Sequence, residues 1–141
     1  MSHTAVITGL LFEARLIARA ARRQGLAAPM PAIAAGGSAE RASQAARRLA
    51  DQGAGALLSF GIGGGLDARL APGDLVIASA VYGAGKAAID CDSHWAAALA
   101  EATGARRAPV LTSQAPVATA LEKARLFEDT GAALVDMESH G

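Results

Sequence analysis

The chain has 141 residues, the length of about one domain, with 52% hydrophobic residues and thirteen basic residues that balance thirteen acidic ones. The hydrophobic content excludes a disordered chain, and the balanced charge excludes the basic field of a nucleic-acid-binding protein. A single cysteine, Cys91, excludes an internal disulfide and a multi-cysteine metal site. No apolar run reaches the roughly 18 residues of a membrane span, and Met1–Leu10 lacks the basic start of a secretory signal. We therefore expect a soluble cytoplasmic protein without an integral membrane segment.

Short apolar runs alternate with helical patterns along the chain. The predicted strands are Thr4–Thr8, Pro31–Ala35, Ala56–Phe60, Asp74–Tyr82, Pro109–Ser113 and Ala132–Met137. The predicted helices are Leu11–Arg23, Ala39–Gln52 (with Ser38 as its N-cap), Asp92–Thr103 and Thr119–Asp129. Strands interleaved with helices are typical of an α/β domain with a largely parallel sheet. The last strand precedes Gly141, where the helix that covers it would begin, so we expect the sequence to be a fragment.

A glycine-rich segment, Gly61-Ile-Gly63-Gly64-Gly65-Leu66, follows the third predicted strand. A dinucleotide fingerprint would need glycine at position 66 and an acidic residue about 20 residues downstream to hold a ribose, and neither is present. A P-loop is excluded because no Lys-Ser/Thr pair follows. The segment is therefore either a glycine-rich turn or a strand end at which backbone groups contact a ligand.

Carboxylates follow the first and the last predicted strands. Glu13 stands in the opening turn of a helix, where the helix dipole favours a surface glutamate; the alternative is a general base that faces the cleft at the strand end. Asp136 and Glu138 flank Met137, and alternation along a strand would put both carboxylates on one side. Two neighbouring carboxylates are costly unless they are exposed or bound to hydroxyl groups or cations.

The three histidines, His3, His94 and His140, are scattered and lack the spacing of metal ligands. Cys91 and Trp95 are expected to pack rather than to react. The sequence therefore indicates no metal site and no redox cofactor.

Four segments, in this order and at this spacing, resemble those of one enzyme superfamily. They are Ile7-Thr-Gly-Leu-Leu-Phe-Glu13, Ser59-Phe-Gly-Ile-Gly-Gly-Gly-Leu66, Pro72-Gly-Asp-Leu-Val76 and Val135-Asp-Met-Glu-Ser139. The set is similar to the nucleoside phosphorylase and methylthioadenosine/S-adenosylhomocysteine nucleosidase superfamily. Its glycine segment and the terminal Asp-Met-Glu-Ser-His are most similar to hopanoid-associated phosphorylases, which are linked to adenosylhopane. The resemblance runs from residue 5 to the C-terminus.

The resemblance implies an α/β fold with a phosphorylase-type mixed, largely parallel sheet, flanked by helices in three layers and here lacking the last strand and helices. Residues 1–141 would form a single nucleoside phosphorylase-like domain that is incomplete at its C-terminus. The resemblance also implies that the chain forms a homo-oligomer and that its substrate is a purine nucleoside.

The implied activity is cleavage of the N-glycosidic bond of a 5′-substituted, adenosylhopane-like purine nucleoside, with release of adenine. Glu13 would hold or activate the nucleophile, and Glu138 would accept hydrogen bonds from the ribose hydroxyls. The remaining implied contacts are Gly63 and Gly64 along the ribose and purine, Met137 against the sugar, and Pro116 and Val117 in the base-stacking segment, where neither offers an aromatic ring.

Two questions stay open: whether the nucleophile is water or phosphate, and whether the chain has a catalytic acid. The family name favours phosphate as a co-substrate, whereas the charge of Glu13 would repel an anion and favours water. The family also protonates the leaving purine with an aspartate on a later strand than any in this sequence. General acid catalysis typically raises a reaction rate by about 10²–10⁴-fold, so a chain without this acid would be nearly inactive. The alternative function is therefore a non-catalytic or vestigial nucleoside-binding domain.

Overall fold

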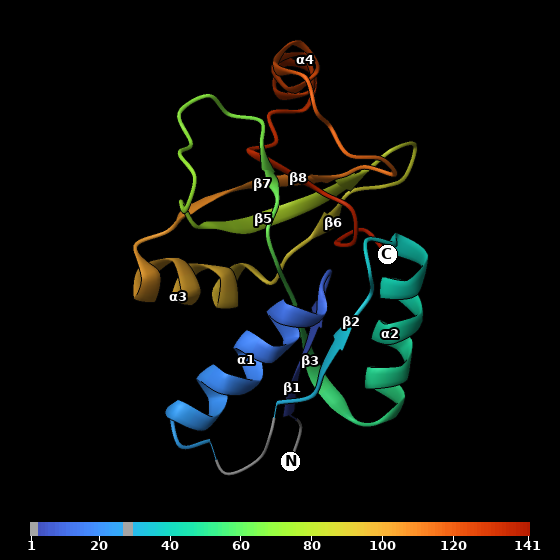
Figure 1. Cartoon of the computed structure of the whole chain (residues 1–141), viewed down its shortest axis with the longest axis vertical. Helices are drawn as coiled ribbons and strands as arrows, with labels where there is room; N and C mark the ends of the chain where they lie inside the picture. Colours follow the sequence, from blue (N-terminus) through green and yellow to red (C-terminus); the bar gives the residue numbers. More distant parts are fainter. Residues whose placement is uncertain (1–2, 27–29) are drawn as a thin grey trace. The chain divides into compact units, whose positions relative to one another are not determined.

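The computed structural model describes residues 3–26 and 30–141 of the chain (Figure 1). The chain divides into two compact units, one formed by the residues up to Ile62 together with Gly141 and the other by Gly63–His140. Each unit has its own sheet.

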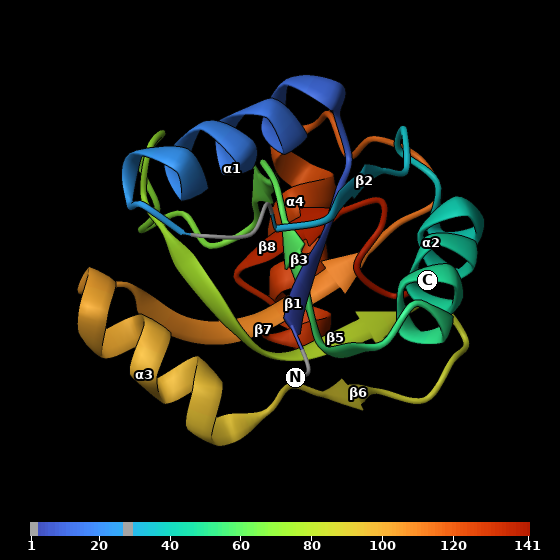
Figure 2. The ribbon, with the colours of Figure 1, turned by 90° about the horizontal axis from the view of Figure 1, so that it is seen from below.

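The first unit is a parallel sheet with a helix after each of its first two strands. Its elements are β1 (His3–Thr8), α1 (Leu11–Arg23), β2 (Ala32–Ala34), α2 (Ala39–Asp51) and β3 (Ala54–Phe60), and the strand order is β2-β1-β3. The chain leaves β1 for one neighbour and returns past it to the other. Right-handed crossovers in opposite directions put the two helices on opposite faces of the sheet, as Figure 2 shows.

The central strand β1 is apolar because both of its faces are covered. Ala5 and Ile7 face α2 and form a core with it, whereas Val6, which is fully buried, points to the other face. The α2 helix contributes two small side chains, Ala42 and Ala45, and one larger one, Leu49. Alanine at positions 42 and 45 lets the helix approach the sheet closely, which explains how an alanine-rich sequence builds a core with few aromatic residues.

The two helices of this unit begin in different ways. The Ser38 hydroxyl caps α2 by accepting a hydrogen bond from the Arg41 N–H at 3.3 Å, as the sequence predicts. Arg41 occupies the position where a capping box would have an acid, and its guanidinium instead donates to the Ala35 and Gly36 carbonyls. Gly36 has φ +65°, so the turn before α2 requires glycine. The α1 helix has no capping side chain at Leu10, and the carboxylate of Glu13 takes that role.

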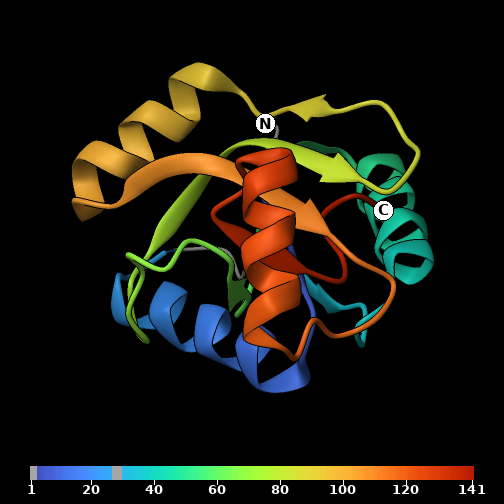
Figure 3. The same ribbon diagram turned by 90° about the horizontal axis from the view of Figure 1, so that it is seen from above.

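The second unit is a mixed sheet with the strand order β4-β8-β7-β5-β6. Its elements are β4 (Gly64–Gly65), β5 (Val76–Gly83), β6 (Ile89–Asp90), α3 (Ser93–Thr103), β7 (Arg106–Thr112), α4 (Ala120–Thr130) and β8 (Leu134–Asp136). The three central strands are parallel, and each edge strand pairs antiparallel. The α4 helix packs on this sheet through Leu126 and Phe127, which contact a buried cluster around Leu111 and Val135 (Figure 3).

Every strand and helix expected from the sequence is present, and the α/β class with parallel strands flanked by helices is confirmed. The two-residue edge strands β4 and β6 were not predicted, because they are too short to show a period in the sequence. The prediction that the last strand continues to Met137 is wrong. The strand ends at Asp136, and residues 137–140 form a bend and a turn, so strand alternation does not relate Asp136 to Glu138.

Candidate functional site

Glu13 lies at the carboxyl edge of the first sheet, where strand-end ligand sites of α/β proteins form. β1 and β3 end side by side at Thr8 and Phe60, and Glu13 stands in the first turn of the helix that follows β1. Its side chain is 2% exposed. The expectation of a surface glutamate is therefore wrong for this residue.

Two backbone amides hold the Glu13 carboxylate. The Leu10 N–H donates to Oε2 at 2.8 Å, and the Ile62 N–H donates to Oε1 at 3.0 Å. The first contact is local capping of α1, but the second comes from 49 residues along the chain, just after β3. The carboxylate thus links the turn after β1 to the segment after β3.

Gly61 permits this contact. A Cβ atom built on Gly61 would lie 3.1 Å from both carboxylate oxygens of Glu13, closer than an ordinary van der Waals contact. Glycine at this position therefore leaves room for the buried carboxylate, a close approach that the sequence does not show.

The glycine segment continues into the second unit, where it forms an edge of the mixed sheet. Gly64 pairs with Val135 of β8, and a Cβ atom on Gly63 would lie 3.0 Å from the Val135 carbonyl oxygen. The glycine segment is therefore not only a turn, because Gly64 and Gly65 form a short strand. Gly63 is exposed, and its backbone lies beside the carboxyl end of β8.

Met137 and Glu138 follow directly on β8 and are half-buried. The Met137 N–H donates to Glu138 Oε2 at 3.3 Å. The structure thus brings Gly63, Gly64, Met137 and Glu138 to the carboxyl end of one strand. Glu13 belongs to the first unit.

Pro116 and Val117 lie in the segment between β7 and α4. Pro116 is exposed, whereas Val117 packs against the apolar cluster that includes Leu111 and Val135. The structure therefore gives Val117 a packing contact in the second unit.

A hydrogen-bonded network beside Glu138 was not predicted from the sequence. Thr112 Oγ1 donates to Asp136 Oδ1 at 2.7 Å, and the Ser139 hydroxyl and N–H also donate to the Asp136 carboxylate. The N–H of His140 donates to Thr112 Oγ1 at 3.0 Å, and its Nε2 lies 2.7 Å from the Ala87 carbonyl oxygen. The expectation that a carboxylate here needs hydroxyl partners holds for Asp136. The row Gly83–Thr112–Asp136 could not be found without the register of the three strands.

A second buried carboxylate, Asp67, lies after β4. Arg69 donates to both of its oxygens, and Arg106 at the start of β7 donates to Oδ2 at 2.7 Å. The hydrogen bonds from Arg69, with those from Arg106, hold the pKa of Asp67 well below its usual range. The two arginines occupy both carboxylate oxygens of Asp67, so we assign this cluster to the structure of the second unit.

Two features are absent from the part of the chain that the structure describes. Among residues 3–26 and 30–141, no group of three or more His, Cys, Asp or Glu side chains could hold a metal ion. In the same part of the chain, no helix is long and apolar enough to cross a membrane.

Solved structures share this fold at low sequence identity. A futalosine hydrolase mutant of Helicobacter pylori is 13% identical with a TM-score of 0.80, and the match covers 99% of this chain and 80% of that one. The Campylobacter jejuni 5′-methylthioadenosine/S-adenosyl homocysteine nucleosidase is 15% identical with a TM-score of 0.77, over 99% of this chain and 77% of that one. The S-adenosylhomocysteine nucleosidase of Streptococcus pyogenes, solved with 5-methylthiotubericidin, is 17% identical with a TM-score of 0.77, over 97% and 74%.

Sequence comparison gives the family. No curated protein matches the chain. The family model of the phosphorylase superfamily matches residues 32–141, which is more than half of the chain and includes the glycine segment and the Met137–Glu138 pair. With the fold and this match together, the chain belongs to the phosphorylase superfamily.

Proposed function

We propose that this protein cleaves the N-glycosidic bond of a 5′-substituted purine nucleoside and releases adenine by hydrolysis. The observation that carries the proposal is the Glu13 carboxylate, buried at the carboxyl edge of a parallel sheet and held there by two backbone amides. A capping role alone would account for the Leu10 contact. It would not require the second amide from Ile62 or a glycine at position 61.

The held carboxylate suits the activation of a water molecule. Each oxygen of Glu13 accepts one backbone N–H, and a carboxylate has about four acceptor sites, so each oxygen keeps the capacity to accept a further hydrogen bond. Glu13 is the proposed general base: it would take a proton from the water molecule that attacks the anomeric carbon as the C–N bond to adenine breaks, and solvent water would protonate the departing adenine. The negative charge of Glu13 disfavours a phosphate anion at the same place, which is why we propose water as the nucleophile.

Glu138 is the proposed ribose ligand. Glycosidic cleavage develops positive charge on the sugar, so carboxylates and hydroxyl contacts that strengthen in the transition state accelerate it. Glu138 and Met137 stand at the end of β8, where a carboxylate for the hydroxyls and an apolar side chain for the sugar face are next to each other in the chain. The exposed backbone of Gly63 is the proposed neighbour of the same nucleoside.

The proposed substituent at the 5′ position is large and apolar, as in adenosylhopane. Support comes from the sequence of the glycine segment and of Asp136–Ser139, which resembles hopanoid-associated members. The names of the structural neighbours include nucleosidases for 5′-methylthioadenosine and S-adenosylhomocysteine, which carry other 5′ substituents. A cytoplasmic homo-oligomer is part of the same proposal.

Release of adenine tests the proposal. The protein is incubated with 5′-methylthioadenosine and with an adenosine bearing a long 5′ alkyl chain, each with and without phosphate, and adenine and sugar products are separated by chromatography. We expect adenine and the free sugar, without a sugar phosphate, and faster release from the alkyl compound.

A variant of Glu13 separates catalysis from binding. Glu13→Gln should lower kcat by about 10²-fold or more, because the general base is lost, and should leave KM nearly unchanged. Nucleoside binding without adenine release from the unchanged protein would contradict catalysis and support a non-catalytic nucleoside-binding domain. Formation of a sugar 1-phosphate would overturn the choice of water.

A further inference from the structure

The turn that carries Glu138 is held at both of its ends by Asp136 of β8 and Thr112 of β7, and the His140 ring at its far end lies against Gly83 of β5. Gly83, Thr112 and Asp136 are in register across β5, β7 and β8, so they form one row at the carboxyl edge of the second sheet. Asp136 is the residue at which β8 ends, and His140 is the last residue of the bend and turn that follow. The residues between them include the proposed ribose ligand.

The directions of the hydrogen bonds in this network follow from its chemistry. The His140 N–H can only donate, so Thr112 Oγ1 accepts it, and the hydroxyl proton of Thr112 points to Asp136. Asp136 also accepts the Ser139 N–H and hydroxyl, which ties the middle of the turn to its start. Thr112 and His140 are both 7% exposed, so water does not compete readily for these bonds.

The His140 side chain adds a second attachment. Its Nε2 lies 2.7 Å from the Ala87 carbonyl oxygen, and a carbonyl only accepts, so Nε2 carries the proton in this arrangement. The ring lies directly on Gly83. A Cβ atom there would be 2.7 Å from Cγ of His140, so a side chain at position 83 would have to displace the ring.

We propose that His140 is a positioning residue for Glu138, which holds the Met137–Ser139 turn through its backbone bond to Thr112 and its ring bond to Ala87. Asp136 and Thr112 form the strand side of the attachment, and Gly83 provides the space for the ring. The inference rests on the proposed ribose contact of Glu138. Its effect is to fix the carboxylate before the nucleoside binds, which lowers the conformational entropy lost on binding.

A matched pair of variants tests the ring bond. The amide nitrogen of Gln can reach the position of histidine Nε2, whereas the shorter Asn side chain cannot, so His140→Gln keeps the donor to Ala87 and His140→Asn loses it. We expect His140→Asn to weaken nucleoside binding by about 3- to 10-fold, which is less than loss of the Glu138 charge would cost because Glu138 is displaced and not removed, and to leave free adenine binding unchanged. His140→Gln should bind the nucleoside within about twofold of the unchanged protein.

A double-mutant cycle tests the contact with Gly83. Gly83→Ala should weaken nucleoside binding in the same way as His140→Asn, because the new methyl group displaces the ring. In a His140→Ala background the ring is absent, so Gly83→Ala should have no further effect. Additive effects of the two substitutions would overturn the contact.

Amide hydrogen exchange gives a readout that does not depend on a nucleoside. His140→Asn should speed the exchange of the Ser139 and His140 amides by about tenfold or more, and His140→Gln should not. If the unchanged protein binds no nucleoside, the proposed function fails, and exchange still decides whether His140 holds the turn. The positioning role would be overturned if His140→Asn changed neither the amide exchange rates nor the nucleoside affinity. It would also be overturned if the Asn and Gln variants lost nucleoside affinity equally.

Discussion

Two glutamates at equivalent helix positions occupy different environments. Glu13 and Glu122 are each the third residue of a helix, in α1 and α4. Glu122 is exposed, whereas Glu13 is 2% exposed and accepts an amide from the segment after β3. Helix position alone therefore does not determine the role of the residue. What distinguishes Glu13 is the second strand end beside it.

Replacement of Glu13 by glutamine should destabilise the protein. A carboxamide has one oxygen, so its NH₂ group would meet either the Leu10 or the Ile62 N–H, and one buried donor would lose its acceptor. We expect a loss of about 1–3 kcal/mol in the free energy of unfolding, measured by urea denaturation. Glu122→Gln is the matched control and should change stability by less than about 0.5 kcal/mol. Equal effects of the two substitutions would contradict the buried-acceptor role.

Replacement of Glu138 by glutamine tests the ribose contact. The substitution keeps the shape and removes the charge, so binding of a nucleoside should weaken by about 10- to 100-fold. Free adenine lacks the ribose and should bind both proteins equally. Calorimetry measures both ligands, and equal nucleoside affinity in the two proteins would reject the role of Glu138.

At the scale of elements, Asp67 joins the segment after β4 to the start of β7. Its carboxylate is buried and receives hydrogen bonds from Arg69 in the same segment and from Arg106 in the strand. These partners lower the pKa of Asp67 in the folded protein relative to its usual value of 3.8. A lowered pKa means that the unfolded chain binds the proton more readily.

The stability contributed by Asp67 should therefore depend on pH in one direction. It is fully present above the usual carboxyl pKa and is lost as the pH falls below about 4. We expect the free energy of unfolding to fall more steeply between about pH 5 and pH 3 in the unchanged protein than in Asp67→Asn, which lacks the titrating group. Asp129→Asn, an exposed substitution in α4, is the control and should keep the slope of the unchanged protein. Equal slopes in the unchanged protein and Asp67→Asn would contradict this link.

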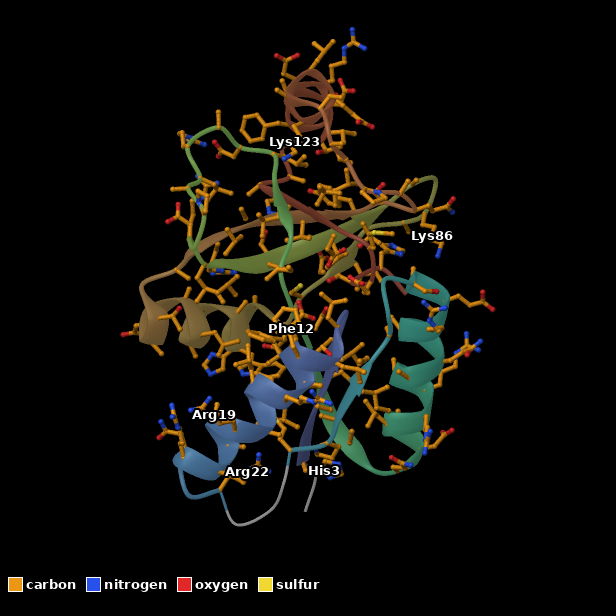
Figure 4. All side chains as sticks on the ribbon, viewed as in Figure 1. His3, Phe12, Arg19, Arg22, Lys86 and Lys123 are labelled. Atoms are coloured by element: carbon orange, nitrogen blue, oxygen red, sulfur yellow. The ribbon has the colours of Figure 1, made fainter. Side chains whose placement is uncertain are left out.

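At the scale of the whole molecule, the exposed apolar side chains of α1 suggest that copies of the chain associate. Leu11, Phe12 and Leu16, here called the α1 apolar face, are 69%, 50% and 50% exposed. Phe12 projects from the start of the helix, and Arg19 and Arg22 follow towards its end (Figure 4). Several exposed large apolar side chains on one helix are typical of protein interfaces.

We expect this face to mediate association between copies of the chain. Light scattering over a range of concentrations should show a mass that increases with concentration, and the double variant Leu11→Glu/Leu16→Glu should remain monomeric at the same concentrations. Leu121→Glu changes a leucine on α4 that is 63% exposed and serves as the control. A monomer at all concentrations, or equal dissociation by both variants, would contradict the expectation.

The sequence by itself determined the elements and their class. Apolar runs such as the one in Asp74–Tyr82 and helix signals such as Ser38 before Ala39 are local, so they predict strands and helices without knowledge of what these elements contact. The alternation of the two element types then favours parallel strands, which the pairing of β1 with its neighbours and of β7 with its neighbours confirms.

Only the tertiary structure decided the environments of the candidate site residues. The burial of Glu13 depends on an amide 49 residues away, and the row Gly83–Thr112–Asp136 depends on the register of three strands. The short strand β4 forms because Gly64 and Gly65 pair with β8. A strand of two residues is too short to show a pattern in the sequence. These features arise from contacts between distant segments, whereas the local pattern of side chains encodes only which segments become helices or strands.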